Sequence, residues 1–338
     1  MDKFVVFCSG STNLDAVKYV VEEGFKVDIL VGLDHNKFEK DKVSGLTDIS
    51  EFATKINAQF YAAASYDLSK PCDKDFLLSQ NIRLIWVAGW QRLLPQWLLR
   101  HSTGGAIGGH GSPDGINKGR GRSPQNWALI MGCSNFKIAL FELSAGIDDG
   151  PVIYEKEFNY TIFDDIKTSY KKVSLCMGSM VAEYLSSKIH QPISLNKDGS
   201  SMYYPQRIAS DGNIDWNAKV NDIYNFVRAL THPYPLARSV INKNEVKLEA
   251  ATPFDDYKGE PGLISFVFED SSFLVNARDG RLIVNKYCTE SDWVPVANEK
   301  FEIVNTSDNI MEIIQRHKFK LPNYRITERI LNFYQVKE

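Results

Sequence analysis

The chain has few of the features that would place it in a membrane, a disulfide framework or a zinc site. Its five cysteines form no C-x-x-C pair, and no histidine cluster accompanies them. We therefore expect reduced thiols and no bound metal. The longest apolar run near the N-terminus, Phe4 to Cys8, spans about five residues, far below a signal or membrane-spanning segment. The sequence predicts a soluble protein that stays in the cytoplasm.

An excess of positive charge is also missing. The formal net charge is −3, so no general electrostatic attraction to nucleic acid is expected. Composition is otherwise ordinary for a globular protein, with 43% hydrophobic and 24% charged residues. A length of 338 residues suits two domains better than one.

The first 190 residues alternate short apolar runs with helical periodicity. This pattern predicts an α/β domain with a doubly wound, mostly parallel sheet over residues 1–190. The predicted strands are 4–8, 27–31, 58–61, 83–87 and 137–143, and the predicted helices are 14–23, 123–131 and 164–190.

Beyond residue 190 the pattern changes. Residues 191–215 are rich in Ser, Asn, Pro, Asp and Gly, which predicts a linker. Short strands broken by turns then follow a predicted helix at 220–230, which favours a small C-terminal β-barrel, OB-like, within residues 216–338. The tail from 310 to 336 returns to helical spacing, and both dimerisation and coverage of the barrel are open interpretations for it.

Two stretches carry the residues suited to chemistry. Residues 108–132 hold His110 in a glycine-rich loop with several cations before a predicted helix, an arrangement that suits an anionic ligand. Asp148 follows in a second turn, so the two loops could deliver a His–Asp pair for proton transfer. A solvated turn explains either residue equally well. The turn from Ser9 and Gly10 to Asn13 is also ambiguous between phosphate contact and a helix cap.

The ordered set of these residues resembles the folate-dependent formyltransferases, which include methionyl-tRNA formyltransferase, glycinamide ribonucleotide formyltransferase and the sugar-nucleotide N-formyltransferases. That family has an Asn-x-His-x-Ser loop, a Lys-x-Arg-Gly segment, a Pro before a helix and a later Asp-x-Gly turn. The residues that match in order are His110, Ser112, Lys118, Arg120, Gly121, Pro124, Asp148 and Gly150. Residues 87–95 are similar to the family's folate-pocket segment, and residues 212–216 and 227–235 to the start of its C-terminal domain.

The resemblance implies a Rossmann-like catalytic domain and 10-formyltetrahydrofolate as formyl donor. It implies that His110 relays the proton of the acceptor amine and that Asp148 orients the imidazole of His110. It also implies that no metal takes part. Folate contacts are expected from Trp90, Gln91, Arg92, Leu93 and Leu94. Substrate contacts are expected from Ser112, Lys118, Arg120 and Arg122, with Ser9 and Gly10 as the further phosphate candidates.

One position departs from the family pattern. The family's catalytic Asn lies two residues before the His, where this chain has Gly108. The loop after Ser112 also has two extra residues and carries Asn117 where Pro is usual. The resemblance implies that this Asn donates a hydrogen bond to the formyl oxygen as it becomes an oxyanion. Loss of one such donor typically costs about 2.7–4 kcal/mol of transition-state stabilisation. A water, a backbone N–H or Asn117 could supply the donor; a slow enzyme and a binding-only relative are the other readings.

Residues 119–129 are most similar to the sugar-nucleotide enzymes, so the expected acceptor is an amino sugar carried on a nucleotide. Arg120 and Arg122 would meet its diphosphate. Methionyl-tRNA is the runner-up, although acidic residues interrupt any basic stripe in residues 206–338. A catalytically impaired folate- or nucleotide-binding protein and a formyl-folate hydrolase are further alternatives.

Overall fold

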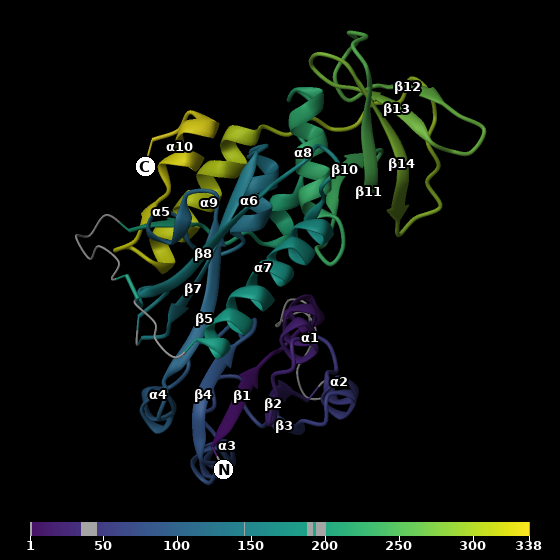
Figure 1. The fold of residues 1–338 in the computed structure, drawn as a ribbon. Coiled ribbons are helices and arrows are strands. Elements are labelled where there is room, and N and C mark those ends of the chain that lie inside the picture. Colours follow the sequence, from purple (N-terminus) through teal and green to yellow (C-terminus); the bar gives the residue numbers. More distant parts are fainter. Residues whose placement is uncertain (1, 35–45, 145, 188–191, 194–200, 338) are drawn as a thin grey trace. The chain divides into compact units, whose positions relative to one another are not determined.

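The computed structural model describes residues 2–34, 46–144, 146–187, 192–193 and 201–337 (Figure 1). They form two compact units. The first unit comprises Met1–Arg120, Lys137–Phe158 and Tyr170–Ser200; the second comprises Gly121–Phe136, Asn159–Ser169 and Ser201–Glu338. The predicted domain end at 190 and residues 191 and 194–200 of the predicted linker lie outside the described residues, so those boundaries stay a prediction.

The first unit is built around a seven-stranded sheet of order β3-β2-β1-β4-β5-β7-β8. β1 to β5 are parallel, and β7 runs antiparallel to β5. The strands are β1 (Lys3–Phe7), β2 (Ile29–Leu33), β3 (Gln59–Ala63), β4 (Ile82–Val87), β5 (Ala106–Ser112), β7 (Asn135–Glu142) and β8 (Val152–Asn159). The predicted mostly parallel sheet is confirmed.

Helices cover both faces of this sheet because its strands are apolar on both sides. Along β1, Phe4 and Val6 pack in one cluster with α1 and α7, whereas Val5 and Phe7 pack in another with α3 and α4. This alternation is the period of a strand buried on two faces. The helices are α1 (Leu14–Glu22), α2 (Ser50–Lys55), α3 (Pro71–Leu78), α4 (Gln96–His101), α5 (Gly115–Lys118) and α7 (Ile166–Ser186).

The expectation that His110 sits in a glycine-rich loop is wrong, because the residue lies within β5. Glycine is normally depleted from strands, which explains the error. Here the glycines allow close packing: a Cβ on Gly109 would lie 2.0 Å from the Met177 methyl carbon. β4 ends at Val87, which pairs with Gly108, so β5 runs on past the end of its neighbour. His110 is on this extension and pairs with β7.

The second unit contains a five-stranded antiparallel sheet of order β10-β11-β14-β13-β12. α8 (Val220–Leu230) packs Ile223 and Val227 into the same apolar cluster as the sheet. The strands are β10 (Ala237–Ile241), β11 (Asn244–Asp255), β12 (Ile264–Val267), β13 (Phe273–Asn276) and β14 (Arg281–Thr289). The predicted small antiparallel β domain is confirmed, and its closure into an OB-like barrel stays a prediction.

The C-terminal tail packs on its own unit. Arg316 of α9 pairs with Asp211 at 2.6 Å, and the Thr327 N–H donates to the carbonyl of Tyr203. The tail thus covers the second unit, while a role in dimerisation stays a prediction. The remaining elements are η1 (Ser11–Asn13), β6 (Arg120–Gly121), α6 (Pro124–Ile130), β9 (Met202–Tyr204), η3 (Ala209–Gly212), α9 (Thr306–Lys320), β15 (Arg325–Ile326) and α10 (Glu328–Tyr334). Among the described residues, no helix is long and apolar enough to cross a membrane.

Candidate active site

A slot of about 140 Å³ opens in the first unit beside the extension of β5. Its walls include Trp90 and Leu94 from the segment after β4, Gly108 from β5, Leu143 after β7, and Asp148. In open α/β sheets, ligands bind beyond the carboxyl ends of the strands, near the point where the strand order reverses. The order here reverses between β1 and β4, and the slot lies beyond the carboxyl end of β4, on the side of β5 and β7.

His110 and Asp148 form a pair at this slot. His110 Nδ1 lies 3.4 Å from Asp148 Oδ2, and His110 Nε2 lies 2.8 Å from the carbonyl oxygen of Gly119. Because a carbonyl oxygen only accepts, Nε2 carries a proton and donates it. The imidazole is thereby fixed in orientation, with Nδ1 turned to the carboxylate. The sequence-predicted pair is brought together.

The turn that delivers Asp148 depends on a close backbone approach. Asp148 adopts a left-handed conformation (φ 49°), which Asp tolerates better than most residues. A Cβ on Gly150 would lie 1.7 Å from the Glu142 carbonyl oxygen, so this position requires glycine. Asp149 accepts a hydrogen bond from the Ser144 hydroxyl. The Gly-Ile-Asp-Asp-Gly turn therefore has one tight conformation, which aims Asp148 at the slot.

The segment after β4 is held by Tyr66, a residue that no sequence pattern singles out. The Tyr66 hydroxyl accepts from the Gln91 N–H at 2.9 Å and lies 3.3 Å from the Ser9 hydroxyl. Its ring packs edge-on against Trp90, with centroids 4.8 Å apart, and Arg92 stacks over it at 4.9 Å. Tyr66 is 25 residues from Gln91 and 57 from Ser9, so no local motif could reveal these contacts.

The predicted folate residues divide by location. Trp90, Arg92, Leu93 and Leu94 all line the slot, whereas Gln91 is not among its lining residues. Leu93 is 58% exposed and lies at the slot. The indole nitrogen of Trp90 is buried and has no hydrogen-bond partner. A flat heterocycle could pack against the apolar side chain of Leu93 and accept a hydrogen bond from the Trp90 indole.

Ser9 and Gly10, two of the predicted substrate residues, contact other parts of the first unit. Ser9 is 1% exposed, and its hydroxyl donates to the Gly89 carbonyl at 2.9 Å. Gly10 is buried and forms an isolated bridge with Leu46. Both therefore help to place the slot-lining segment, and their predicted contact with phosphate stays a prediction.

Ser112 shapes the enlarged loop that follows β5. It is fully buried; its hydroxyl donates to the Gly115 carbonyl at 2.9 Å and accepts from the Asp114 N–H at 3.2 Å. A Cβ on Gly119 would lie 1.7 Å from this hydroxyl oxygen, so the loop closes on Ser112 only with glycine there. The same Gly119 carbonyl accepts from His110, which couples the loop to the imidazole.

Polar side chains of this loop have hydrogen-bonding atoms without a partner among the described residues. Asn117, on α5, has a buried side-chain oxygen with no partner, and it is not among the slot-lining residues. Arg120 is 5% exposed, and its Nε has no partner among the described residues; its Nη1 donates a long hydrogen bond, 3.5 Å, to the Ile147 carbonyl. Lys118 is exposed in the first unit, and Arg122 is exposed in the second.

The departure at Gly108 has a packing reason. A Cβ at this position would lie 2.7 Å from the Cδ2 atom of Leu143, which itself lines the slot. A larger side chain at 108 would therefore displace Leu143. Glycine and leucine together fill the space in which the related proteins are expected to hold an asparagine.

Residues 208–292 fit the family model described as "Formyl transferase, C-terminal domain". The matched range begins near η3 and includes α8 and the strands β10 to β14.

Two curated proteins are similar over a longer range. The bifunctional polymyxin resistance protein ArnA of Wigglesworthia glossinidia brevipalpis is 30% identical over 273 residues, which cover 78% of this chain. The chain spans only 40% of that protein's length. A methionyl-tRNA formyltransferase of Thermodesulfovibrio yellowstonii is 29% identical over 225 residues, covering 66% of this chain and 71% of the relative.

Among solved structures, an N-formyltransferase from Helicobacter canadensis in complex with folinic acid and dTDP-3-aminofucose has a similar fold. The TM-score is 0.57 at 16% identity, covering 85% of this chain and 100% of the other. At this identity the likeness concerns the fold. The expected architecture, an α/β domain followed by a smaller β domain, is therefore confirmed.

Proposed function

We propose that this chain transfers a formyl group from 10-formyltetrahydrofolate to a primary amine, because it is similar to a methionyl-tRNA formyltransferase and to the C-terminal domain of formyl transferases. The acceptor we propose is an amino sugar carried on a nucleotide. Its five cysteines are free thiols, which suits the reducing cytoplasm.

The observation that carries the proposal is the His110–Asp148 pair at the slot. A formyl group held there would meet a carboxylate on the slot wall and an imidazole fixed behind it. Proton transfer by such positioned groups contributes typically 100- to 10,000-fold to a rate. In this proposal the folate ring occupies the space beside Trp90 and Leu94, with the exposed Leu93 at its edge.

The proposed reaction needs one proton to move from the acceptor to the donor. The neutral amine attacks the formyl carbon, a C–N bond forms, and the carbonyl oxygen becomes an oxyanion. The amine proton passes to the His110–Asp148 pair. Collapse of the oxyanion breaks the bond to folate N10, which receives the proton, so that tetrahydrofolate leaves neutral at this nitrogen.

The oxyanion donor is proposed to be Asn117, in place of the asparagine absent at Gly108. Asn117 belongs to the enlarged loop, and its buried side-chain oxygen has no partner among the described residues. It does not line the slot in the present structure. The proposal therefore requires the loop between Ser112 and Arg120 to move toward the slot when the substrates bind.

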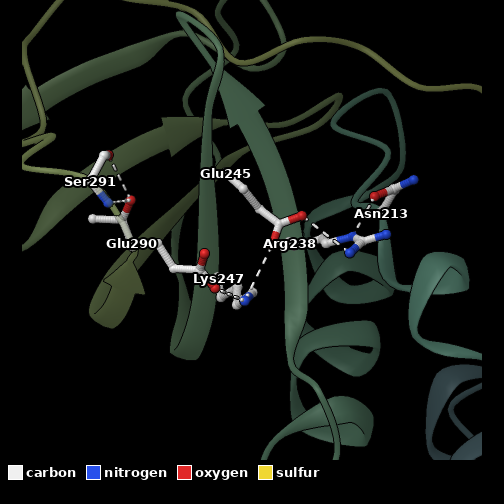
Figure 2. Close-up of polar contacts among 7 residues, drawn as sticks. Asn213, Arg238, Glu245, Lys247, Glu290 and Ser291 are labelled. Carbon is white, nitrogen blue, oxygen red and sulfur yellow. Dashed lines mark hydrogen bonds and ion pairs between the residues drawn. The ribbon is translucent and has the colours of Figure 1, made fainter.

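Charge pairing on the antiparallel sheet of the second unit argues against tRNA binding to this sheet. Figure 2 shows Arg238 lying between Asn213 and Glu245, and Lys247 between Glu245 and Glu290. The other ion pairs of this sheet and its flanks are Arg281–Asp255, Lys286–Glu249 and Lys300–Glu260. Cations that are already paired offer little charge to a phosphate backbone.

Methionyl-tRNA remains the second candidate for a specific reason. The relative from Thermodesulfovibrio yellowstonii bears that name, and the matched family model covers the C-terminal domain. A binding-only protein is the candidate from another class, and it would account for Gly108 without a substituted donor. Retention of both members of the His110–Asp148 pair favours catalysis over this alternative.

An acceptor panel tests the proposal. The purified chain is incubated with 10-formyltetrahydrofolate and, separately, dTDP- and UDP-linked 3- and 4-amino sugars, methionyl-tRNA, or no acceptor. Formylated product and tetrahydrofolate are followed by mass spectrometry. We expect a formylated amino sugar and no product with His110→Ala. Formyl transfer to tRNA alone would overturn the proposal of an amino-sugar acceptor. Release of tetrahydrofolate without an acceptor would indicate a hydrolase, and folate binding without turnover would indicate a binding protein.

A further inference from the structure

A second and larger cavity lies wholly within the second unit. Its volume is about 490 Å³, compared with about 140 Å³ for the slot of the first unit. α8, α9 and α10 contribute to its walls, together with Ile130 at the end of α6 and the stretch from Arg207 to Asp222. Small-molecule sites typically measure about 300–1,000 Å³. The cavity can therefore take a small organic molecule, and the tail beyond residue 300 helps to enclose it.

Arg207 brings an incompletely matched charge to this cavity. Its guanidinium stacks between the rings of Trp127 at 4.8 Å and Phe226 at 5.3 Å, and burial lowers its pKa. It donates to the main-chain carbonyl of Asp211, whose carboxylate is occupied by Arg316 and by the Ile208 N–H. Among the described residues, no carboxylate forms an ion pair with Arg207. A guanidinium has five N–H donors, so several remain for a ligand.

The rim of the cavity adds further positive charge. Lys219 and Arg278 are exposed there, and neither has an ion-pair partner within the described part of the chain. Two carboxylates also line the cavity, but Asp215 already accepts from the Asn217 N–H and from the N–H and hydroxyl of Thr306. That leaves Asp222 as an acceptor for a donor group of the ligand. The cavity thus favours an anion.

The remaining wall combines apolar side chains with several neutral polar ones, among them Tyr334 and Asn213. Ile130, Ile223, Phe226 and Ile313 supply flat hydrocarbon surface. Burial raises the pKa of Tyr334 to about 12, so its hydroxyl keeps its proton and can donate. The side-chain oxygen of Asn213 accepts from Arg238 Nε (Figure 2), so its amide nitrogen is the group that it can offer a ligand.

We infer that this cavity is a binding site for a small organic anion that carries a ring, separate from the proposed formyl-transfer site. A phosphate or carboxylate group pairs with Arg207 and the rim cations Lys219 and Arg278. The ring lies against the apolar wall, and hydroxyl or amino groups of the ligand donate to Asp222. Guanidinium groups bind both kinds of anion in a bidentate fashion, so the cavity alone does not select between them.

Isothermal titration calorimetry on the full chain tests this inference. Uridine 5′-monophosphate and orotate serve as phosphate and carboxylate probes, with uridine and inorganic phosphate as the matching neutral ring and ringless anion. We expect saturable binding of at least one ring-bearing anion, and binding about tenfold or more weaker for uridine and for inorganic phosphate. The preferred probe identifies the anion.

Variants assign the binding to one unit. A Lys219→Ala/Arg278→Ala double variant changes exposed residues only and is expected to weaken the preferred probe about tenfold or more. Lys258→Ala, which removes an exposed cation of the same unit outside the cavity lining, should leave binding within about twofold. Lys118→Ala in the first unit should likewise leave this binding unchanged.

Two results would overturn the inference. One is the absence of saturable binding for both ring-bearing anions. The other is binding that survives the double variant and is lost in Lys118→Ala, which would place the anion in the first unit. Neither result depends on formyl transfer, so failure of this inference and failure of the proposed function are distinguishable. Circular dichroism of each variant checks that the fold is retained.

Discussion

The proposed site of the first unit and the sheet of the second differ in how their charged side chains are paired. Around the slot, the Trp90 indole, the Asn117 amide oxygen and the Arg120 Nε are buried without partners in the described structure. On the sheet, Arg238 and Lys247 each meet a carboxylate. A buried polar atom without a partner costs about 1–3 kcal/mol, whereas an exposed pair contributes about 0–1 kcal/mol.

This difference distinguishes side chains that are available to bind a ligand from side chains that pair with one another within the protein. Buried neutral atoms without partners occur in both units, Ser265 and Asn276 of the sheet included, so the contrast concerns charge. Among the described residues, the buried guanidinium of Arg120 pairs with no carboxylate, which is expected where a substrate supplies the missing partner. The charges of the sheet balance one another and leave little for a polyanion. The variants below test whether the unpartnered groups carry function and whether the paired ones do not.

The largest effect is expected from the His–Asp pair. His110→Ala removes the proton relay and should lower kcat by about 100- to 10,000-fold, as positioned acid–base groups typically contribute. Initial rates of tetrahydrofolate formation with a saturating acceptor measure this. Binding of 5-formyltetrahydrofolate by the variant should be close to that of the wild type. A kcat within threefold or so of wild type would remove His110 from the mechanism.

Asn117→Ala is expected to have the next largest effect. Loss of one oxyanion donor costs about 100- to 1,000-fold in kcat, with KM little changed. The matched control is Gly108→Asn, which restores the family residue. It should not raise kcat, because its Cβ would lie 2.7 Å from Leu143 Cδ2. A normal kcat for Asn117→Ala would show that water or the backbone supplies the donor.

Arg120→Met separates binding from stability. If the buried guanidinium awaits an anionic acceptor, KM for the acceptor should rise roughly 10- to 100-fold, the range that a charge-assisted hydrogen bond provides. At the same time the free energy of unfolding should rise by about 1 kcal/mol, because an unmatched buried charge is removed. Steady-state kinetics and urea unfolding measure the two quantities.

The exposed Arg122→Met serves as the stability control for that variant. We expect its free energy of unfolding to stay within about 0.5 kcal/mol of wild type. A fall in the unfolding free energy of Arg120→Met with an unchanged KM would assign Arg120 a structural role instead.

Tyr66→Phe tests how the slot is positioned. The change removes the acceptor of the Gln91 N–H and the contact with Ser9, while the ring contact with Trp90 remains. The free energy of unfolding should fall by about 1 kcal/mol, and KM for the folate should rise a few-fold with little change in kcat. A drop in kcat with unchanged KM would contradict a positioning role.

The smallest effect is expected on the sheet of the second unit. Removing both partners in Arg238→Ala/Glu245→Ala should change the free energy of unfolding by less than about 1 kcal/mol and leave the kinetic constants for the acceptor unchanged. The dependence of KM on salt should also stay the same. A steep salt dependence in the wild type that the variant reduces would support a polyanionic acceptor such as tRNA.

The sequence predicted those parts of the fold in which local pattern decides structure. The β1 to β4 strands have apolar side chains on both faces, and α8 has the range expected from its periodicity. β5 was read as a loop because its glycines serve long-range packing against Met177. β8 gave no signal because its residues are mostly exposed or half-buried.

Those parts of the candidate site that depend on local sequence motifs were also predictable. The pairing of His110 with Asp148 followed from motif order, and the structure brings the two side chains together. The contacts of Tyr66 join segments far apart in the chain, so no spacing rule reveals them. The burial of Ser9 and Ser112 was equally invisible, because turn-forming serines have the same sequence signature whether they bind a ligand or the backbone.

A crystal structure with 5-formyltetrahydrofolate tests the central claim most directly. The account predicts the pterin in the slot beside Trp90 and Leu94, with the formyl group about 3 Å from the His110–Asp148 pair or from Asn117. Folate bound outside this slot, or bound with its formyl group out of reach of all three residues, would contradict it.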